Sequence, residues 1–558
     1  MQRNLELLEK KHFDLLVIGG GINGAWIALD ATQRGMHVAL IEKGDFGAAT
    51  SAATGRMVHG GIRYLQHLSF GRLRRSLHER MLLLKNAPHL VHPLRFLIPT
   101  SGHGMKGKEI LSLAMFAYDL FAAKAVPNSP YATIHGHARC TRNETLHLEP
   151  LLSPEGVTGS VCFTDCQMPY PERLTLAVVK SADAHGAVVA NYAKAREIIL
   201  KNKTVAGCLM EDMLTGEERT IKAKCVVNAA GPWMRELTKS IVPSSIRSTR
   251  QEKPGQPRIL SKGIHIITRS LTNGHGLALA TRHQHAGSWL NRGGRHFFIV
   301  PWEGLSLVGT TNVPFHGELD DPLVFEEDIL GLIADVNSVY PAAGLRREDV
   351  RYFYGGLYPD DPSEGQGYQG GRKDVITDHD QSDGVGGLLS VTGVKYTTSR
   401  HLAERVVNLA VRKLKRETLP CRTAGTVLHG GDIPGYDAFK EQVKESLAGV
   451  MRAEDAIRLV RHYGSKTRAV LKESDSKSPC RPMNHGALTV AQVRYGVLHE
   501  MARKLSDVLF RRTDVGLRGC PTDEILWSLA RVMAQELGWD EQRIKQEIVT
   551  VKTTYRTS

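Results

Sequence analysis

The feature that most constrains this chain is an apolar run that ends directly in a glycine-rich turn. Phe13–Ile18 has the length of a buried parallel strand, and Gly19–Gly24 after it fits the pattern G-x-G-x-x-G. A helical pattern follows, and a second apolar run, Met36–Ile41, ends in the acidic Glu42. This order of strand, glycines, helix, strand and acid predicts a βαβ unit that binds a dinucleotide.

The glycines and the acid of this unit have separate tasks. Gly19 permits the tight turn, Gly21 lets the backbone approach a pyrophosphate, and Gly24 lets the helix pack on the strand. The pyrophosphate would meet the helix N-terminus, where N–H groups and the helix dipole favour anions. Glu42 can accept hydrogen bonds from the adenosine ribose, which argues against a cofactor with a 2′-phosphate. The unit by itself does not separate NAD from FAD.

Three later stretches favour FAD. Gly47–Ala53 is a loop of small residues, over which a bulky flavin half can lie close to the backbone. Cys225–Trp233 is an apolar run that ends in a Gly-Pro turn, and Gly387–Gly393 is another strand and glycine at the entry to a helix. Gly393 at that junction would direct helix-terminal N–H groups at the pyrimidine edge of a flavin. We therefore predict FAD as the cofactor.

Length and composition limit the class of protein. The 558 residues are too many for one core, because single cores stop growing near ~250–300 residues. A hydrophobic share of 42% with 23% charged residues is globular usage and excludes a disordered or coiled-coil chain. The longest apolar stretch, roughly Ile110–Ala123, is interrupted by Tyr118 and Asp119 and is shorter than the ~20 residues of a membrane span. Met1–Lys11 lacks the apolar core of a signal peptide, so we expect a soluble or peripheral protein made in the cytoplasm.

The charge balance favours anionic partners. Lys and Arg number 72 against 58 Asp and Glu, which gives a net charge of +14. Phosphorylated metabolites, anionic lipid and nucleic acid would all suit such a protein. The basic residues are scattered without aromatic interleaving, so we expect no nucleic-acid partner.

The eight cysteines predict neither a disulfide framework nor a metal site. None of them forms a CxxC pair, and disulfides are rare in a long chain of this compartment. Cys162 with Cys166, and His135 and His137 with Cys140, could be read as metal ligands. Neither group has a second half at zinc-like spacing, so we expect loop or core residues and no metal.

Motifs along nearly the whole chain resemble those of the FAD-dependent, quinone-linked glycerol-3-phosphate dehydrogenases, within the wider D-amino-acid-oxidase-like flavoproteins. They occur in the family's order: Ala49–Ser51, His59–Leu65, Ala87–Leu90, Thr164–Cys166, Ala230–Trp233, Lys262–His265, Gly309–Thr311, Lys395–Thr398 and Asp507–Thr513. The resemblance implies an α/β fold with a Rossmann-type FAD-binding domain, an inserted β-rich substrate domain and an α-helical C-terminal domain. We expect an FAD-dependent oxidoreductase unit at 1–429, with the substrate insertion at about 240–350, and a helical cap domain at 430–558.

The resemblance also implies a reaction. sn-Glycerol 3-phosphate would be oxidised at C2 to dihydroxyacetone phosphate by hydride transfer to the flavin N5, and a quinone would take the electrons. A quinone dissolves in lipid, so the protein would associate peripherally with the inner face of the membrane, and a homodimer is one option for its assembly. Such a site needs a base for the hydroxyl proton, cations for the phosphate, and a cation or dipole at the flavin N1–C2=O edge.

Family-matching residues supply candidates for these roles. His265 is the expected base, Arg63 with Tyr64 the expected substrate clamp, and Lys395 the expected group at the flavin–substrate edge. Arg56 and Tyr358 are further expected substrate contacts. The expected cofactor contacts are Gly19, Gly20, Gly21, Ile22, Asn23, Gly24, Glu42, Lys43, Thr50, Ser51, Gly60, Gly231, Gly393, Lys395 and Thr397.

The chain departs from the family in its expected substrate pocket. The family's Gly-Val-Arg-Pro, whose Arg anchors the substrate, is Gly356-Leu357-Tyr358-Pro359 here, and Tyr358 offers neither a positive charge nor a bidentate fork. Gly-Thr-Thr-Asp has become Gly309-Thr310-Thr311-Asn312, and Gly-Gly-Lys has become Gly393-Val394-Lys395. Arg56 replaces a Lys and keeps its charge. Arg292, Arg295 or Arg351 could supply the missing cation.

These departures leave other functions open. A dehydrogenase or oxidase of another small hydroxy or amino acid with the same fold is the main alternative. A flavoprotein that modifies RNA has only the positive net charge in its favour.

Three further patterns concern structure more than chemistry. Phe70–Arg80 combines basic residues with apolar positions at helical spacing, which fits either an interfacial membrane helix or a helix that packs inward. His296–Val300 and Leu305–Gly309 predict a hairpin. In the C-terminal part, apolar residues from Val490 to Leu509 keep helical spacing, and a second helix is predicted to start after Thr522.

Overall fold

The structure is a computed structural model of the 558-residue chain. It describes residues 1–66, 69–101, 111–112, 115–116, 118–119, 121, 136–239, 241, 260–280, 296–321, 323–359, 374–393, 395–474, 482–483 and 488–557. Among these residues no helix is both long and apolar enough to span a membrane. The candidate cations Arg292 and Arg295 lie outside the described residues.

The predicted βαβ unit is confirmed and lies at the centre of an eight-stranded sheet. Strand β1 (His12–Ile18) leads through Gly19–Gly21 into α2 (Ile22–Gln33) and then into β2 (Val38–Ile41), which pairs with β1 in parallel. The strand order is β17-β18-β10-β1-β2-β7, with the β8–β9 hairpin added at β10. The other strands are β7 Val188–Ala190, β8 Ala193–Lys201, β9 Thr204–Asp212, β10 Glu218–Asn228, β17 Val375–Asp378 and β18 Leu388–Thr392.

Two helices pack beside α2 on this sheet, and the buried side chains between the helices and the sheet form one hydrophobic core. α7 (Pro171–Ala184) and α12 (Ser399–Lys413) lie beside α2, and Leu15, Val17, Ala28 and Val407 are among the fully buried residues between them. Strands β1, β2, β10 and β18 run parallel, so their carboxyl ends meet at one edge. The strand order reverses between β1 and β10, which is where open α/β sheets bind ligands.

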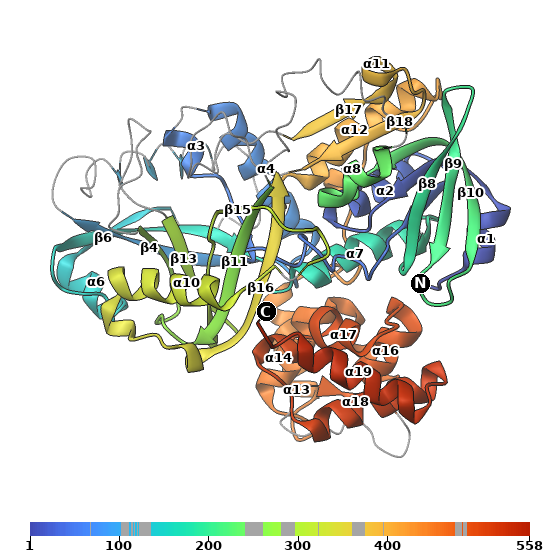
Figure 1. Ribbon diagram of the computed structural model, residues 1–558. Coiled ribbons are helices and arrows are strands. Elements are labelled where there is room, and N and C mark those ends of the chain that lie inside the picture. Colours follow the sequence, from blue (N-terminus) through green and yellow to red (C-terminus); the bar gives the residue numbers. More distant parts are fainter. Residues whose placement is uncertain are drawn as a thin grey trace.

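A second, mostly antiparallel sheet of ten strands lies beside the first (Figure 1). Five of its ten strands come from the expected insertion at about 240–350, and the other five come from residues 57–167 and 350–359. The predicted hairpin is confirmed as β13 and β14. The strands are β3 Met57–Val58, β4 His92–Ser101, β5 Ala138–Thr141, β6 Val157–Gln167, β11 Leu260–Arg269, β12 Gly276–Ala280, β13 His296–Trp302, β14 Leu305–Gly309, β15 Val313–Phe315 and β16 Val350–Pro359.

The C-terminal part is helical and gathers below both sheets in Figure 1, from orange to red. Its α-helices are α13 Tyr436–Ser446, α14 Ala453–Tyr463, α15 Thr467–Leu471, α16 Val490–Glu500, α17 Leu505–Asp507, α18 Asp523–Leu537 and α19 Glu541–Thr553. The second predicted helix is confirmed as α18: Thr522 caps its start, and Gly538 ends it in a left-handed conformation. A domain boundary after residue 429 stays a prediction.

The expected continuous helix from Val490 to Leu509 is wrong. α16 ends at Glu500, and Met501 takes a left-handed backbone with φ +56° before α17 begins. At this turn the buried Glu500 carboxylate accepts hydrogen bonds from Arg173 of α7 at 2.6 and 3.0 Å, which fixes the end of α16 against α7. Apolar spacing alone carries no sign of that ion pair.

Buried ion pairs of Asp45 with Arg511 and Arg512, here called the ionic joint, connect this C-terminal part to the first sheet. The Asp45 carboxylate, three residues after Glu42, accepts hydrogen bonds from Arg512 at 2.8 Å and from Arg511 at 2.5 Å. Arg512 also donates to the Glu500 carbonyl oxygen at 2.6 Å, and Asn191 donates to Asp45 at 3.0 Å. The joint therefore fixes the loop after β2, which carries the expected ribose contact.

We expect Arg512→Ala to lower the free energy of unfolding by about 3–5 kcal/mol, because removing one partner leaves the Asp45 charge buried without its main counterion. The fall in Tm, followed by flavin fluorescence and by circular dichroism, measures the effect. Arg346→Ala is the matched control, because its partner Glu348 is 69% exposed and exposed ion pairs contribute little.

Acidification tests the same joint. Burial opposes ionisation of Asp45, but the charges of Arg512 and Arg511 outweigh burial and lower its pKa to about 2. Since an unfolded Asp has a pKa of ~4, the stabilisation is complete above that pH and is lost as the pH falls towards 2. The wild type should therefore lose more stability than Arg512→Ala between these pH values. An equal loss in both proteins would contradict the assignment.

Candidate active site

One cavity of about 830 Å³ lies between the carboxyl edge of the first sheet and the face of the second sheet. This volume is within the ~300–1,000 Å³ of small-molecule and cofactor sites. Most of the predicted cofactor contacts line it: Gly19, Gly21, Ile22, Asn23, Glu42, Lys43, Thr50, Ser51, Gly231, Gly393, Lys395 and Thr397. Residues from four strand ends that are distant in the sequence are thus brought together, as expected of a dinucleotide site.

The three other glycines of that prediction lie behind the cavity wall and act through packing. A Cβ on Gly24 would lie 1.9 Å from the Gly19 carbonyl oxygen, and one on Gly20 would lie 2.6 Å from the Phe46 ring. Gly60 donates its N–H to the buried Asp165, and a Cβ there would lie 1.9 Å from the Tyr118 hydroxyl.

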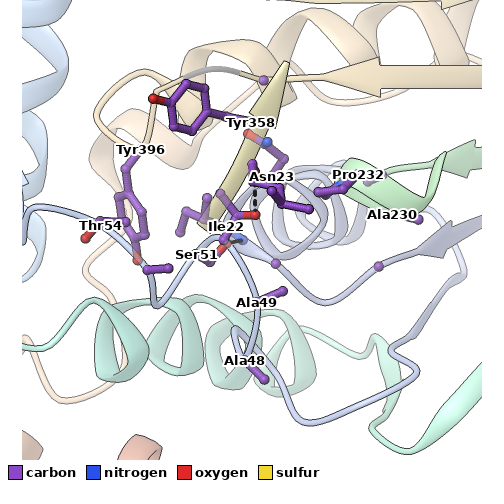
Figure 2. Close-up of a pocket in the computed structure, with 18 of the residues that line it drawn as sticks. Ile22, Asn23, Ala48, Ala49, Ser51, Thr54, Ala230, Pro232, Tyr358 and Tyr396 are labelled. Atoms are coloured by element: carbon purple, nitrogen blue, oxygen red, sulfur yellow. Dashed lines mark hydrogen bonds between the residues drawn. The ribbon is translucent and has the colours of Figure 1, made fainter. Parts of the chain in front are cut away.

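The start of α2 is built to receive a pyrophosphate. Gly21 is its N-cap and offers no side-chain cap, so the backbone of the first turn faces the cavity. Ser51 accepts a hydrogen bond from the Ile22 N–H at 2.9 Å and holds the small-residue loop against this turn (Figure 2). A Cβ on Gly21 would lie 3.0 Å from the Ser51 oxygen. A Cβ at this position would crowd the hydroxyl that holds the loop, whereas glycine leaves the backbone of the turn open to a phosphate.

The carboxylate of Glu42 marks the ribose end. It accepts hydrogen bonds from the N–H groups of Gly20 at 2.7 Å and Gly44 at 2.8 Å. Burial raises the pKa of Glu42, and the two N–H groups oppose that rise. Each oxygen keeps a further lone pair for a ribose hydroxyl. At the rim, Asp320 accepts hydrogen bonds from Lys43 and from the Trp233 indole, both at 2.9 Å.

The loop before α12 fits a flavin ring, although the helix begins at Ser399, six residues after Gly393, and not at the predicted junction. A Cβ on Gly393 would lie 2.4 Å from the side-chain nitrogen of Asn23, so only glycine allows this approach. The buried side-chain oxygen of Asn23 has no hydrogen-bond partner among the described residues, which is an acceptor left for a bound group. Thr397 accepts a hydrogen bond from the His59 N–H at 3.1 Å. The loop at Gly393 beside Asn23, the N-terminus of α2 and the Glu42 carboxylate together fit an FAD molecule in extended form.

Lys395 and Tyr64, predicted apart, meet at the cavity wall. The Lys395 ammonium donates a hydrogen bond to the Tyr64 hydroxyl and lies 3.9 Å from the centre of its ring. Burial raises the pKa of Tyr64. The side chain of Arg63 lies outside the described residues, so its expected clamp role stays a prediction.

His265 faces the cavity from the middle of β11. Its ring stacks on Tyr354 with centres 5.2 Å apart, and a Cβ on Gly309 would lie 2.3 Å from it. Burial, with the nearby Arg56 charge, lowers the pKa of His265 to about 3, so the imidazole is neutral at physiological pH. The ring nitrogen Nδ1 is buried without a hydrogen-bond partner among the described residues. His265 is therefore a neutral acceptor beside the flavin cradle.

Arg56 is not placed for the expected substrate contact. It is fully buried behind His265 and donates to Glu172 at 2.8 and 3.2 Å and to the Pro169 carbonyl oxygen at 2.6 Å. Its guanidinium lies between the Trp302 and Tyr354 rings, 5.2 and 5.6 Å from their centres. Glu172 neutralises the Arg56 charge that would otherwise bind a substrate phosphate. Arg56 therefore supports the wall of the cavity.

The motifs contained lining residues that we did not single out. His59 lines the cavity beside the buried Asp165, with Nδ1 and a carboxylate oxygen 3.6 Å apart, and both lie in stretches that match the family. Phe298 and Tyr396 also line it. Arg351 is exposed and is not among the described lining residues. Within the described ranges no cluster of three metal-type ligands occurs.

Comparisons with known proteins agree with this geometry. The family model of FAD dependent oxidoreductases (DAO) matches residues 14–408, and that of the C-terminal domain of alpha-glycerophosphate oxidase matches residues 421–544. Over 527 residues the chain is 34% identical to the aerobic glycerol-3-phosphate dehydrogenase of Staphylococcus aureus, which covers 91% of this chain and 87% of that protein.

Solved structures share the fold. The glycerol-3-phosphate dehydrogenase of Bacillus halodurans, complexed with FAD, matches with a TM-score of 0.76 at 28% identity over 99% of this chain and 96% of that chain. The L-alpha-glycerophosphate oxidase of Mycoplasma pneumoniae, with FAD bound, has a TM-score of 0.52 at 16% identity over 75% of this chain and 98% of that chain. The second likeness concerns the fold alone.

Proposed function

The chain belongs to the FAD-dependent glycerol-3-phosphate dehydrogenase/oxidase family, and we propose that it oxidises sn-glycerol 3-phosphate to dihydroxyacetone phosphate. One observation carries this proposal: the cavity brings the neutral His265 and the Tyr64–Lys395 pair to the cradle at Gly393. A base and a cation then face the same space, which oxidation of a phosphorylated alcohol requires.

Each residue of this site has a separate role in the proposed reaction. Bound FAD supplies a two-electron acceptor for the hydride from C2. His265 takes the hydroxyl proton, because its imidazole is neutral and faces the cavity. Lys395 binds anionic oxygen at the wall and holds Tyr64 in position. Arg63, at the start of α3 (Arg63–Gln66), would add a bidentate phosphate contact.

Anaerobic reduction of the bound flavin tests the proposal. Glycerol 3-phosphate should bleach the flavin band near ~450 nm, whereas glycerol should do so poorly because it lacks the anion. A panel of other small hydroxy acids and amino acids covers the alternative, for which Tyr358 in place of the family's Arg is the specific observation. Rapid bleaching by one of these acids with no response to glycerol 3-phosphate would replace the proposed substrate.

A quinone is the acceptor we propose, reached at the surface of an anionic membrane. The predicted interfacial stripe of α4 (Phe70–Asn86) does not serve this purpose, since Leu73, Leu77 and Met81 are buried. Two phenylalanines are exposed instead: Phe70, at the start of the same helix, is 44% exposed and Phe116 is 61% exposed, and the ring centres of Phe70 and Phe121 lie 5.4 Å apart. Arg74 and Arg75 of α4 are exposed near Phe70, which fits an anionic bilayer.

We expect the protein to float with vesicles that contain anionic lipid and to dissociate in high salt. Replacing Phe70 and Phe116 together by Ser should reduce the floated fraction several-fold, because the apolar contact is lost. Val549→Ser is the matched control, as Val549 is also 61% exposed but belongs to α19. Flotation that is unaffected by both phenylalanines would place the membrane contact on another surface.

A further inference from the structure

Three side chains meet at the rim of the cavity, beside its ribose end. The Asp320 carboxylate accepts hydrogen bonds from the Lys43 ammonium and from the Trp233 indole N–H, both at 2.9 Å. The Lys43 ammonium also lies 3.8 Å from the centre of the Trp233 ring. All three residues line the cavity, and Lys43 directly follows Glu42, the expected ribose contact. Lys43, Trp233 and Asp320 are here called the rim latch.

The rim latch joins loops of both sheets. Lys43 lies in the loop after β2, and Trp233 ends the short 3₁₀ helix η2 (Gly231–Trp233) that follows β10. Both strands belong to the first sheet. Asp320 lies in the chain after β15, a strand of the second sheet, and is 277 positions from Lys43 and 87 from Trp233. The contact therefore bridges the two sheets at the rim.

A tight turn holds Asp320 in position. The Asp321 N–H donates a hydrogen bond to the Glu318 carbonyl oxygen at 3.1 Å, as in a β-turn. The Asp321 carboxylate in return accepts one from the Glu318 N–H, also at 3.1 Å. The hydrogen bond from Lys43 lowers the pKa of Asp320, so its carboxylate is charged at neutral pH. Asp320 therefore reaches the rim as an anion on a fixed turn.

The rim latch is exposed, unlike another contact between the two sheets. The Thr50 hydroxyl donates a hydrogen bond at 2.8 Å to the carbonyl oxygen of Leu357, which is buried and whose neighbour Tyr358 lines the cavity. The side chains of Asp320 and Lys43 are 75% and 34% exposed. Because exposed ion pairs are weak, the rim latch opens more easily than the buried contact.

We infer that Lys43, Trp233 and Asp320 retain bound FAD, because they join the two sheets across the rim beside its adenosine half. The start of α2 and Glu42 are the groups that fit the pyrophosphate and the ribose. The rim latch adds a contact between the sheets that must break before this half of the cofactor leaves. The inference concerns the cofactor and does not depend on which substrate the protein oxidises.

The rate at which FAD is lost tests the rim latch without any turnover. The full chain is loaded with FAD, diluted into buffer without flavin, and desalted at successive times. The flavin retained per protein, read from absorbance, gives the dissociation rate. The proteins are the wild type, Asp320→Ala, Trp233→Phe and the double variant, and circular dichroism checks that each is folded.

Asp320→Ala should lose FAD about three- to tenfold faster than the wild type, the effect of one weak ion pair and one hydrogen bond. Simple charge repulsion predicts the opposite sign, because removing an anion near the FAD pyrophosphate would slow its release. Glu318→Ala is the matched control. It removes the same charge from the same turn, but Glu318 is exposed and is not among the described lining residues, so the rate should stay within about twofold.

The double variant tests whether Trp233 acts through Asp320. Trp233→Phe keeps a ring at the rim but loses the indole N–H, so it should release FAD faster than the wild type. Combined with Asp320→Ala it should add nothing, because the acceptor of that N–H is already gone. Unchanged or slower FAD loss in Asp320→Ala, or effects of the two substitutions that multiply, would overturn the inference.

Discussion

Gly24→Ala is expected to give a protein without bound FAD and therefore without activity. The added Cβ would lie 1.9 Å from the Gly19 carbonyl oxygen and 3.3 Å from the Val17 side chain. Neither neighbour can move freely, because both belong to the β1–turn–α2 unit that forms the pyrophosphate site. The helix must shift away from the strand, and overpacking of this kind costs about 1–3 kcal/mol.

The flavin content of the purified protein measures the result. The ratio of flavin to protein absorbance should fall close to zero, and added FAD should not restore it at micromolar concentration. Gly331→Ala is the control, because Gly331 is also helical, within α10 (Glu326–Val339), and nothing lies within 4 Å of its added Cβ. A Gly24→Ala protein that retains stoichiometric flavin would show that the turn tolerates the shift.

The cofactor half of the site could be predicted because its signals are local. The strand, the glycines and Glu42 lie within 30 consecutive residues, so the order of residues nearly fixes the geometry. Gly393 was found from its position at the end of an apolar run, and it does approach Asn23 closely. The same holds for α18, where Thr522 and Gly538 mark the two ends by backbone chemistry.

The rest of the site depends on partners that lie far apart in the sequence. Arg56 matched a cationic position of the family, but its partner Glu172 is 116 residues away and withdraws it from the cavity. Asp45 shows no motif at all, and its partners Arg511 and Arg512 are more than 460 residues away. Whether a charged side chain is buried depends on ion pairs with such distant residues, and sequence periodicity or spacing does not reveal these pairs.

The departures at Tyr358 and Asn312 could be predicted from the sequence only in part. Comparison with the family pattern marked each position separately, since both are residue-by-residue observations. That they form one hydrogen-bonded pair follows only from the register of β16 on β11 and the course of the chain after β14. The sequence thus marked the two positions, and the structure shows that their side chains share one hydrogen bond.

His265→Asn should reduce the rate of flavin reduction by glycerol 3-phosphate by roughly 100- to 10,000-fold, the contribution of a positioned general base. Asparagine fits the space left by Gly309 but cannot take the C2 hydroxyl proton. Burial and the Arg56 charge lower the pKa of the wild-type imidazole to about 3 and keep it neutral. We expect an anionic substrate phosphate beside the ring to oppose that shift. The loss should therefore appear in kcat more than in KM, with the flavin content unchanged.

Stopped-flow reduction under anaerobic conditions measures this step directly. The variant should recover part of its rate at high pH, because hydroxide can replace the missing base, whereas the wild type should change less. His147→Asn is the matched control, since His147 lies exposed in α6 (Arg142–Leu148). If His265→Asn reduces its flavin within about threefold of the wild-type rate, the proton goes elsewhere. His59, which lines the same cavity beside the buried Asp165, would then be the group to replace next.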